Sequence, residues 1–173
     1  MTTTDQERSP LEQAVWDALG EVPDPEIPAV SVVELGMVRS VEAGQGRVRV
    51  ELLPTFVGCP ALEVIRGSVA ERLAGMAPTV EVEATFAEPW SSDRITPVGR
   101  RKLRESGFAP PAPRTAQPPG QPLFATITTR QAARCPFCGS PDTALENPFG
   151  PTLCRAIHWC NQCRQPFEQF KTV

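Results

Sequence analysis

Two Cys-x-x-Cys pairs in the last quarter of the chain constrain its fold more than any other feature: Cys135 with Cys138, and Cys160 with Cys163. A two-residue gap lets two thiolates on one tight turn reach the same ion, and two such turns together make a tetrahedral site. The pattern therefore predicts a metal ribbon, with zinc as the metal because zinc readily takes four sulfur ligands. Pairing as two disulfides is the alternative, and it requires an oxidising compartment. The N-terminal stretch MTTTDQERSP is not apolar enough for a secretion signal, which favours the metal.

We expect this zinc ion to be structural, because four cysteine ligands leave no open position for water or substrate. The segment 131–173 is too short to fold on an apolar core alone, so metal binding would supply much of its stability. The aromatic residues of the segment are expected to pack around the metal knuckles: Phe137, Phe149, Trp159, Phe167 and Phe170.

Proline divides the chain. The segment 109–130 is rich in proline and predicts a semi-rigid linker between an α/β domain, 1–108, and the zinc ribbon, 131–173.

Residues 1–108 contain 11 Lys and Arg against 17 Asp and Glu, whereas residues 109–173 contain 6 against 3. Four thiolates around a Zn²⁺ would bring the ribbon close to neutral, which argues against a nucleic-acid partner. No apolar segment is long enough for a membrane partner, so we expect a cytoplasmic protein.

Residues 1–108 show the periodicities of a small open α/β sheet with helices packed against it. Ser9, Pro10 and Glu12 form a helix start, in which serine caps the helix and glutamate bonds back to it. The segment 47–53 alternates apolar and charged residues, as a half-buried strand does. The expected order is α-β-β-α-β-α, with a helix from Ser9 to Gly20, strands Met37–Glu42 and Arg47–Leu53, a helix Pro60–Gly75, a strand Thr79–Phe86 and a basic helix Pro97–Ser106.

Cys59 is the first candidate functional residue of this domain. It lies between Gly58 and Pro60, about where the N-cap of the following helix is expected. Unpaired N–H groups and the positive end of the helix dipole would stabilise a thiolate there, and glycine would let a ligand approach. The alternative is a small, inert core cysteine.

Asp24 and Glu26 form a second candidate site. They lie two residues apart on a loop bracketed by prolines, where both could bind one cation or cap nearby N–H groups. Solvated turn carboxylates are the alternative. Asp93 is a third candidate, either as a cap of the basic helix or as part of the same pocket, and the cap is favoured.

The same clusters carry a family resemblance. Asp24-Pro-Glu-Ile-Pro28, Thr55-Phe-Val-Gly-Cys-Pro60 and Trp90-Ser-Ser-Asp93 resemble motifs of the small α/β metal–sulfur cluster assembly factors. The resemblance covers residues 10–108. It implies a role in iron–sulfur or other metallocentre maturation, with Cys59, Asp24 and Glu26 holding iron or an iron–sulfur cluster transiently.

The C-terminal part extends the resemblance to nearly the whole chain. Cys135-Pro-Phe-Cys-Gly-Ser140, Phe149-Gly-Pro-Thr-Leu-Cys154 and Pro166-Phe-Glu-Gln-Phe-Lys171 are similar to the PaaD family of phenylacetyl-CoA epoxygenase components. This resemblance implies aerobic phenylacetate breakdown. The implied partners are the oxygenase and reductase subunits of that complex.

Nothing in the sequence points to catalysis by this chain alone. A di-iron carboxylate site requires Glu-x-x-His pairs, and the only histidine is His158 in the predicted ribbon. We expect an accessory maturation factor, which as a one-cysteine carrier would need a homodimer or a shared site. The first alternative is a docking subunit with Cys59 structural, and the second is a thiol enzyme with no identifiable base. Cys154 is expected to pack in the ribbon core rather than bind metal, and His158 to lie on a hairpin face.

Overall fold

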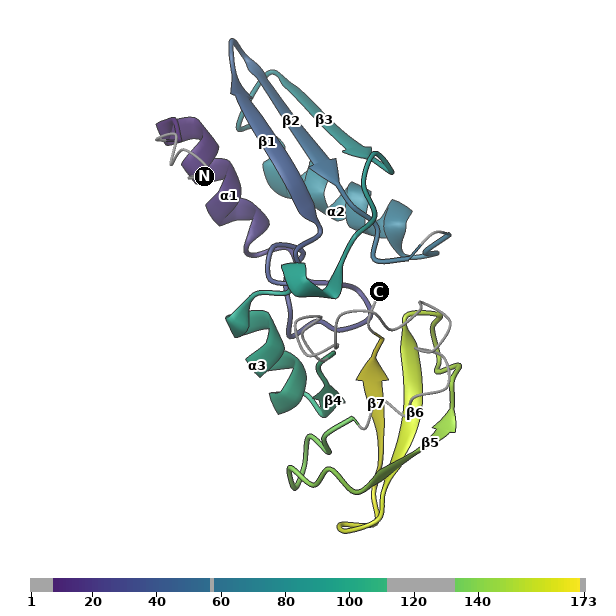
Figure 1. Cartoon of the computed structure of the whole chain (residues 1–173). Coiled ribbons are helices and arrows are strands. Elements are labelled where there is room, and N and C mark those ends of the chain that lie inside the picture. Colours follow the sequence, from purple (N-terminus) through teal and green to yellow (C-terminus); the bar gives the residue numbers. More distant parts are fainter. Residues whose placement is uncertain (1–7, 57, 112–132, 172–173) are drawn as a thin grey trace, which may run out of the picture. The chain divides into compact units, whose positions relative to one another are not determined.

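The structure is a computed structural model, and it describes residues 8–56, 58–111 and 133–171 (Figure 1). The chain forms two compact units. Met1–Pro54 and Pro60–Pro89 make the first unit, and Thr55–Cys59 and Trp90–Val173 make the second. No helix within the described residues is long and apolar enough to cross a membrane.

The first unit begins with helix α1, Pro10–Leu19. The predicted capping box is present: the Glu12 N–H donates to Ser9 Oγ at 3.2 Å, and the Ser9 N–H donates to Glu12 Oε2 at 2.9 Å. Pro10 occupies the first turn, where its missing N–H costs nothing. Val15, Ala18 and Leu19 are buried, so α1 contributes one apolar face to the core.

A three-stranded sheet forms the rest of this unit with helix α2, Leu62–Leu73. Strand β2, Arg47–Leu52, pairs antiparallel with β1, Val38–Gly44, and parallel with β3, Thr79–Ala84. The turn between β1 and β2 places Gln45 and Gly46 at positive φ. Helices α1 and α2 contact each other as well as β1 and β3 respectively. This arrangement confirms the predicted small α/β sheet with helices packed against it.

The two faces of the sheet differ in chemistry, as the alternation in β2 predicts. Val48, Val50 and Leu52 of β2 are completely buried. Arg47 and Arg49 pair with Glu81 and Glu83 on the neighbouring strand β3. These exposed ion pairs are worth little individually, so burial of the apolar side chains stabilises the sheet.

The second unit contains a short 3₁₀ turn η1, Ser92–Arg94, helix α3, Pro97–Glu105, and a four-stranded sheet in the order β4-β7-β6-β5. Strands β5, Thr143–Asn147, β6, Arg155–Cys160, and β7, Pro166–Phe170, are antiparallel neighbours. The two-residue strand β4, Phe108–Ala109, pairs parallel with β7 (Figure 1). Residues 90–109 therefore pack in one unit with the cysteine ribbon. The predicted linker 109–130 lies mostly outside the described residues, so the domain limits 1–108, 109–130 and 131–173 stay a prediction.

Arg100 fixes α3 to the segments on either side of it. Its guanidinium donates to the carbonyl oxygens of Ser92 at 2.6 Å, Ile95 at 3.3 Å and Pro111. Burial lowers the pKa of Arg100, while the nearby Asp93 carboxylate acts in the opposite direction. The helix starts at the N-cap Thr96, whose hydroxyl accepts from the Gly99 N–H at 3.0 Å. Three backbone carbonyls thus hold one arginine, and α3 is anchored where it leads into β4.

Candidate metal sites

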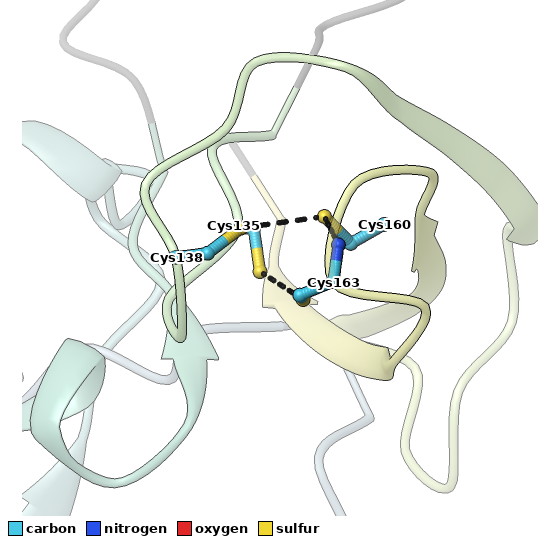
Figure 2. Close-up of side chains that lie close together, drawn as sticks. All are labelled: Cys135, Cys138, Cys160 and Cys163. Atoms are coloured by element: carbon cyan, nitrogen blue, oxygen red, sulfur yellow. Dashed lines mark hydrogen bonds between the residues drawn. The ribbon is translucent and has the colours of Figure 1, made fainter.

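Four cysteine sulfur atoms converge at one point of the second unit (Figure 2). The Sγ atoms of Cys135 and Cys163 are 3.6 Å apart, as are those of Cys138 and Cys160. All four sulfurs lie within 4.8 Å of one another. A disulfide bond would bring two sulfurs to about 2.05 Å, so these distances are those of four separate thiols.

The spacing fits a tetrahedral metal ion. With metal–sulfur bonds of about 2.3 Å, the edge of an S₄ tetrahedron is about 3.8 Å, close to the two short contacts. Within the described residues, this is the group of potential ligands that comes close enough to hold an ion. The geometry therefore supports the predicted metal-binding cluster of Cys135, Cys138, Cys160 and Cys163.

Backbone turns place each cysteine pair. In the first turn, the Gly139 N–H donates to the Cys135 carbonyl at 2.9 Å, and Gly139 has φ +75°, which favours glycine. In the second turn, the Arg164 N–H donates to the Cys160 carbonyl at 3.0 Å, and Arg164 takes φ +60° although it is not glycine. Both pairs thus lie on knuckles closed by the same type of hydrogen bond.

The thiols differ in acidity before any metal is considered. The backbone N–H of Cys163 points at Cys160 Sγ at 3.5 Å and, with help from neighbouring thiols, lowers the pKa of Cys160 to about 7. Burial raises the pKa of Cys163 to about 12, and the neighbouring thiols add to this shift. A divalent cation at the centre would stabilise all four thiolates. Metal binding at this cluster must therefore release protons.

The aromatic residues behave only partly as predicted. Phe167 lies in the core cluster with Cys135 and Cys160, and Phe170 is also buried. Phe137 and Phe149 are 53% and 63% exposed, so the prediction that they pack around the knuckles is wrong. Phe137 occupies the tip of a tight turn and Phe149 a surface loop, and neither position faces a core.

The remaining ribbon candidates lie outside the cluster. Cys154 is buried, with its Sγ 3.2 Å from the Thr152 hydroxyl. His158 is 4% exposed and stacks on Phe167 with ring centroids 5.4 Å apart. Within the part of the chain described, no hydrogen bond of standard geometry reaches either ring nitrogen, and burial lowers the pKa of His158 against a weaker opposing contribution from Gln169. Packing is therefore the role that the structure gives to Cys154 and His158.

In the first unit, Asp24 caps its own loop. Its Oδ1 accepts hydrogen bonds from the N–H groups of Glu26 and Ile27, both at 2.9 Å. The loop is closed further by a hydrogen bond from the Asp24 N–H to the Val30 carbonyl at 2.8 Å. Asp24 is 9% exposed, which excludes a fully solvated turn carboxylate, and Glu26 is half-buried. The capping role is thus present, while cation binding by Asp24 and Glu26 stays a prediction.

Cys59 lies in a turn of the second unit. Its N–H donates to the Phe56 carbonyl at 3.1 Å, and its side chain is partly exposed. Gly58 has φ +82°, and a Cβ there would meet no atom within 4 Å. Helix α2 has Ala61 as its N-cap, so the predicted N-cap position of Cys59 is wrong by two residues. Partial exposure excludes a fully buried core cysteine, and iron binding by Cys59 stays a prediction.

In the Trp90-Ser-Ser-Asp93 motif, Asp93 lacks the helix-capping role expected for it, and Ser92 has a buried hydroxyl that the sequence did not predict. Asp93 lies in η1, where its N–H donates to Ser91 Oγ at 3.3 Å; Thr96 rather than Asp93 caps α3. The Ser92 hydroxyl is completely buried and has no hydrogen-bond partner among the described residues. Sequence reasoning missed Ser92, because a serine in a turn gives no signal that its hydroxyl will be buried.

Two family models match separate parts of the chain. The model of an iron–sulfur cluster assembly protein family matches residues 12–86, and the model of the PaaD zinc beta ribbon domain matches residues 119–171. A solved structure, the domain of unknown function DUF59 from Bacillus anthracis, is 28% identical with a TM-score of 0.51. It covers 54% of this chain and 91% of its own.

Curated relatives are of two kinds. The iron–sulfur cluster carrier protein of Mycobacterium leprae is 34% identical over 119 residues, which cover 68% of this chain but only 30% of the carrier. The putative D subunit of the 1,2-phenylacetyl-CoA epoxidase of Escherichia coli K12 is 38% identical over 167 residues, 95% of this chain and 94% of that protein. This match runs through both units and confirms the resemblance seen in the motifs. The chain belongs to the PaaD family of 1,2-phenylacetyl-CoA epoxidase components.

Proposed function

We propose that this chain is an accessory subunit of the phenylacetyl-CoA ring-epoxidising oxygenase, acting in aerobic phenylacetate degradation. The observation that carries the proposal is the 38% identity to a PaaD protein over 95% of the chain. Because the similarity extends over both units, it supports a shared role of the whole protein rather than of one domain. The partners in this proposal are the oxygenase and reductase subunits, with no nucleic-acid or membrane partner, and the location is cytoplasmic.

Within that role, the chain assists maturation of an iron–sulfur or other metal centre in the complex. Similarity to iron–sulfur cluster carriers and to the assembly family over residues 12–86 supports this part. Cys59 is the proposed ligand of the cargo because its thiol is partly exposed in an open turn. Asp24 and Glu26 are proposed to contribute oxygen ligands. One cysteine holds a cluster poorly, so a homodimer or a partner would complete the site.

The four-cysteine cluster has a different role in the proposal. It binds a structural zinc ion, which the convergence of four sulfurs and the match to a zinc ribbon family support. The four cysteines occupy every position of a tetrahedral ion, so the ion holds the ribbon and leaves no site for substrate. The ribbon then serves to dock the chain on its partners.

Anaerobic metal and sulfide analysis of the wild type and of Cys59→Ser tests the maturation role. We expect zinc in both proteins, and iron with sulfide, below one equivalent, in the wild type alone. Cys154→Ser is the matched control, because it removes a thiol that is 8% exposed and lies outside the four-cysteine cluster. Zinc without iron in all three proteins, even after anaerobic reconstitution, would overturn the maturation role. The chain would then be a docking subunit in which Cys59 is structural.

A further inference from the structure

The two short sulfur contacts of the cluster run between its two turns. We call residues 135–139 the first knuckle and residues 160–164 the second knuckle. Cys135 Sγ lies 3.6 Å from Cys163 Sγ, and Cys138 Sγ lies 3.6 Å from Cys160 Sγ, so each contact joins one knuckle to the other (Figure 2). A disulfide bond is about 2.05 Å long, so either pair needs only about 1.5 Å of further approach to form one. The arrangement that fits one tetrahedral ion is thus also an arrangement of two cross-knuckle pairs.

Contacts that do not involve a metal hold the two knuckles together. Asn161 of the second knuckle donates from its backbone N–H to the Asp142 carbonyl at 3.0 Å, and from its side-chain amide to Asp142 Oδ1 at 2.8 Å. Asp142 follows the first knuckle by three positions. The apolar core cluster also contains one cysteine of each knuckle, Cys135 and Cys160. The four sulfurs should therefore stay close to one another when a bound metal leaves.

Each cross-knuckle pair combines an accessible sulfur with a buried one. Cys138 is exposed and Cys163 is partly exposed. Their respective partners Cys160 and Cys135 are 0% and 2% exposed. A small oxidant can therefore reach one sulfur of each pair directly, while the buried partner lies in position to attack the oxidised sulfur.

We propose that the cluster is a peroxide-sensitive closure of the ribbon, in which hydrogen peroxide expels the zinc ion and disulfides take its place. The new bonds join Cys135 to Cys163 and Cys138 to Cys160. Because both bonds connect the two knuckles, the ribbon stays closed after the metal has left. The inference rests on the zinc site of the proposed function and is independent of iron binding at Cys59.

The reaction balances with two molecules of peroxide. The Cys138 thiolate attacks one peroxide oxygen, the O–O bond breaks, and the departing hydroxide takes up a proton to become water. The Cys160 thiolate then attacks the sulfur of the sulfenic acid, so that the S–S bond forms, the S–O bond breaks and a second water leaves after protonation. Cys163 and Cys135 repeat these steps. Four thiolates, two peroxides and four protons give two disulfides and four waters, and Zn²⁺ departs because only thiolates bind it.

The position of the bonds in the chain favours the cross-knuckle pairing over pairing within each Cys-x-x-Cys motif. The cross-knuckle bonds span 28 and 22 positions, so they restrict the unfolded chain far more than a bond between residues three positions apart. Disulfides within Cys-x-x-Cys motifs are typical of redox enzymes and are readily reduced, whereas structural disulfides resist reduction. Thiol–disulfide exchange in the cluster should therefore end at the cross-knuckle bonds.

Tryptic digestion tests this pairing. Trypsin cleaves after Arg134, Arg155 and Arg164, which separates peptide 135–155 with the first knuckle from peptide 156–164 with the second cysteine pair. The full-length, zinc-loaded chain is treated with hydrogen peroxide, its remaining thiols are alkylated, and the digest is analysed by mass spectrometry without reduction. We expect the two peptides as one disulfide-linked pair from monomeric protein, together with complete loss of zinc to a zinc-binding dye.

Single variants assign the two bonds. Cys138→Ser should keep the peptides linked through Cys135 and Cys163, and leave Cys160 to be alkylated. Cys163→Ser should keep them linked through Cys138 and Cys160, and leave Cys135 to be alkylated. Cys154→Ser is the matched control, because this buried thiol lies on the first peptide but outside the cluster, so its linkage should equal that of the wild type.

Oxidation of the metal-free wild type should give the same linked pair, which tests the pairing even where a variant folds poorly. Its urea midpoint should also exceed that of the reduced, metal-free chain, because the bonds close the ribbon. Equal midpoints would overturn the proposal.

Separate peptides, each with an internal disulfide, would overturn it as well, and so would retained zinc and intact thiols in excess peroxide. Linked peptides found only in covalent dimers, or lost in Cys154→Ser, would show that other sulfurs form the bonds. A chain that binds no zinc would refute the zinc site, while the peptides from the metal-free chain would still decide the pairing. The readouts are disulfides, zinc and unfolding rather than iron, so this test and the maturation test fail independently.

Discussion

Replacing single cysteines of the cluster by serine separates the contribution of metal binding to stability from the contribution of side-chain packing. The two most informative positions are Cys138, which is exposed, and Cys160, which is completely buried. Structural zinc sites contribute roughly 10–16 kcal/mol, so one of four ligands is worth roughly 2.5–4 kcal/mol. Since 1.4 kcal/mol is a factor of about ten, either substitution should weaken zinc affinity on the order of 10²–10³-fold.

The two variants should differ once the metal is removed. Cys160 lies in a core cluster with Ala109, Ala133 and Phe167, so Cys160→Ser buries a hydroxyl there and costs a further ~1–3 kcal/mol. Cys138→Ser places its hydroxyl at the surface, where substitutions usually change stability by less than about 0.5 kcal/mol. Urea unfolding without metal measures the cost of each serine hydroxyl, and urea unfolding with zinc adds the contribution of the metal. Competition with a zinc chelator measures the zinc affinity.

Cys154→Ser is the matched control for the affinity measurement, because Cys154 is a buried ribbon cysteine outside the cluster. Its zinc affinity should equal that of the wild type. A Cys138→Ser protein that keeps wild-type zinc affinity would refute the four-sulfur site. Equal unfolding free energies of the two cluster variants without metal would refute the packing argument for Cys160.

Two further predictions concern a capping carboxylate and a buried imidazole. Asp24→Ala should cost ~2 kcal/mol in urea unfolding because two N–H groups lose their acceptor, whereas Asp24→Asn, which keeps an oxygen, should recover most of it; equal losses would contradict the capping role. His158 has a pKa below its ordinary value of 6.5, so the folded state binds fewer protons than the unfolded state. The contribution of neutral His158 to the free energy of unfolding is therefore present above pH 6.5, and it is lost as the pH falls through 6.5 toward the pKa of the folded state. In unfolding free energies measured from about pH 7.5 to about pH 5.5 in chelator, His158→Phe should show a shallower acid loss than the wild type; identical slopes would contradict this interpretation.

Local signals in the sequence predict the elements that depend on local physics. The Ser9 capping box, the alternation in β2 and the two knuckles each depend on residues within a few positions of one another. The cysteine spacing predicts the metal cluster because the two thiolates on each tight turn can reach the same tetrahedral ion. The segment of β3 is recognisable as a strand in the same way. Its parallel pairing with β2 is not predictable from local sequence, since helix α2 separates the two strands in the chain.

Errors occur at helix ends and where long-range packing decides the position of a side chain. Pro60 suggests an N-terminal helix position, yet α2 begins at Leu62, which leaves Cys59 upstream of the N-cap. Phe137 is apolar and lies between two ligand candidates, which favours a core position, yet its ring rests on Gly107 with half of its surface exposed. Nothing in the local sequence marks Gly107 as the neighbour of Phe137, because thirty positions separate them in the chain.

Because β4 pairs with β7, the ribbon has a source of stability besides metal binding. A ribbon of residues 131–173 alone would leave β7 as an edge strand, and open edges invite non-native pairing. Phe108 and Ala109 cover part of that edge, and Ala109 joins Cys135, Cys160 and Phe167 in the apolar cluster. Arg100 holds the preceding helix in place through three carbonyls. In the proposed zinc-bound state, residues upstream of the ribbon therefore contribute to its stability together with the metal.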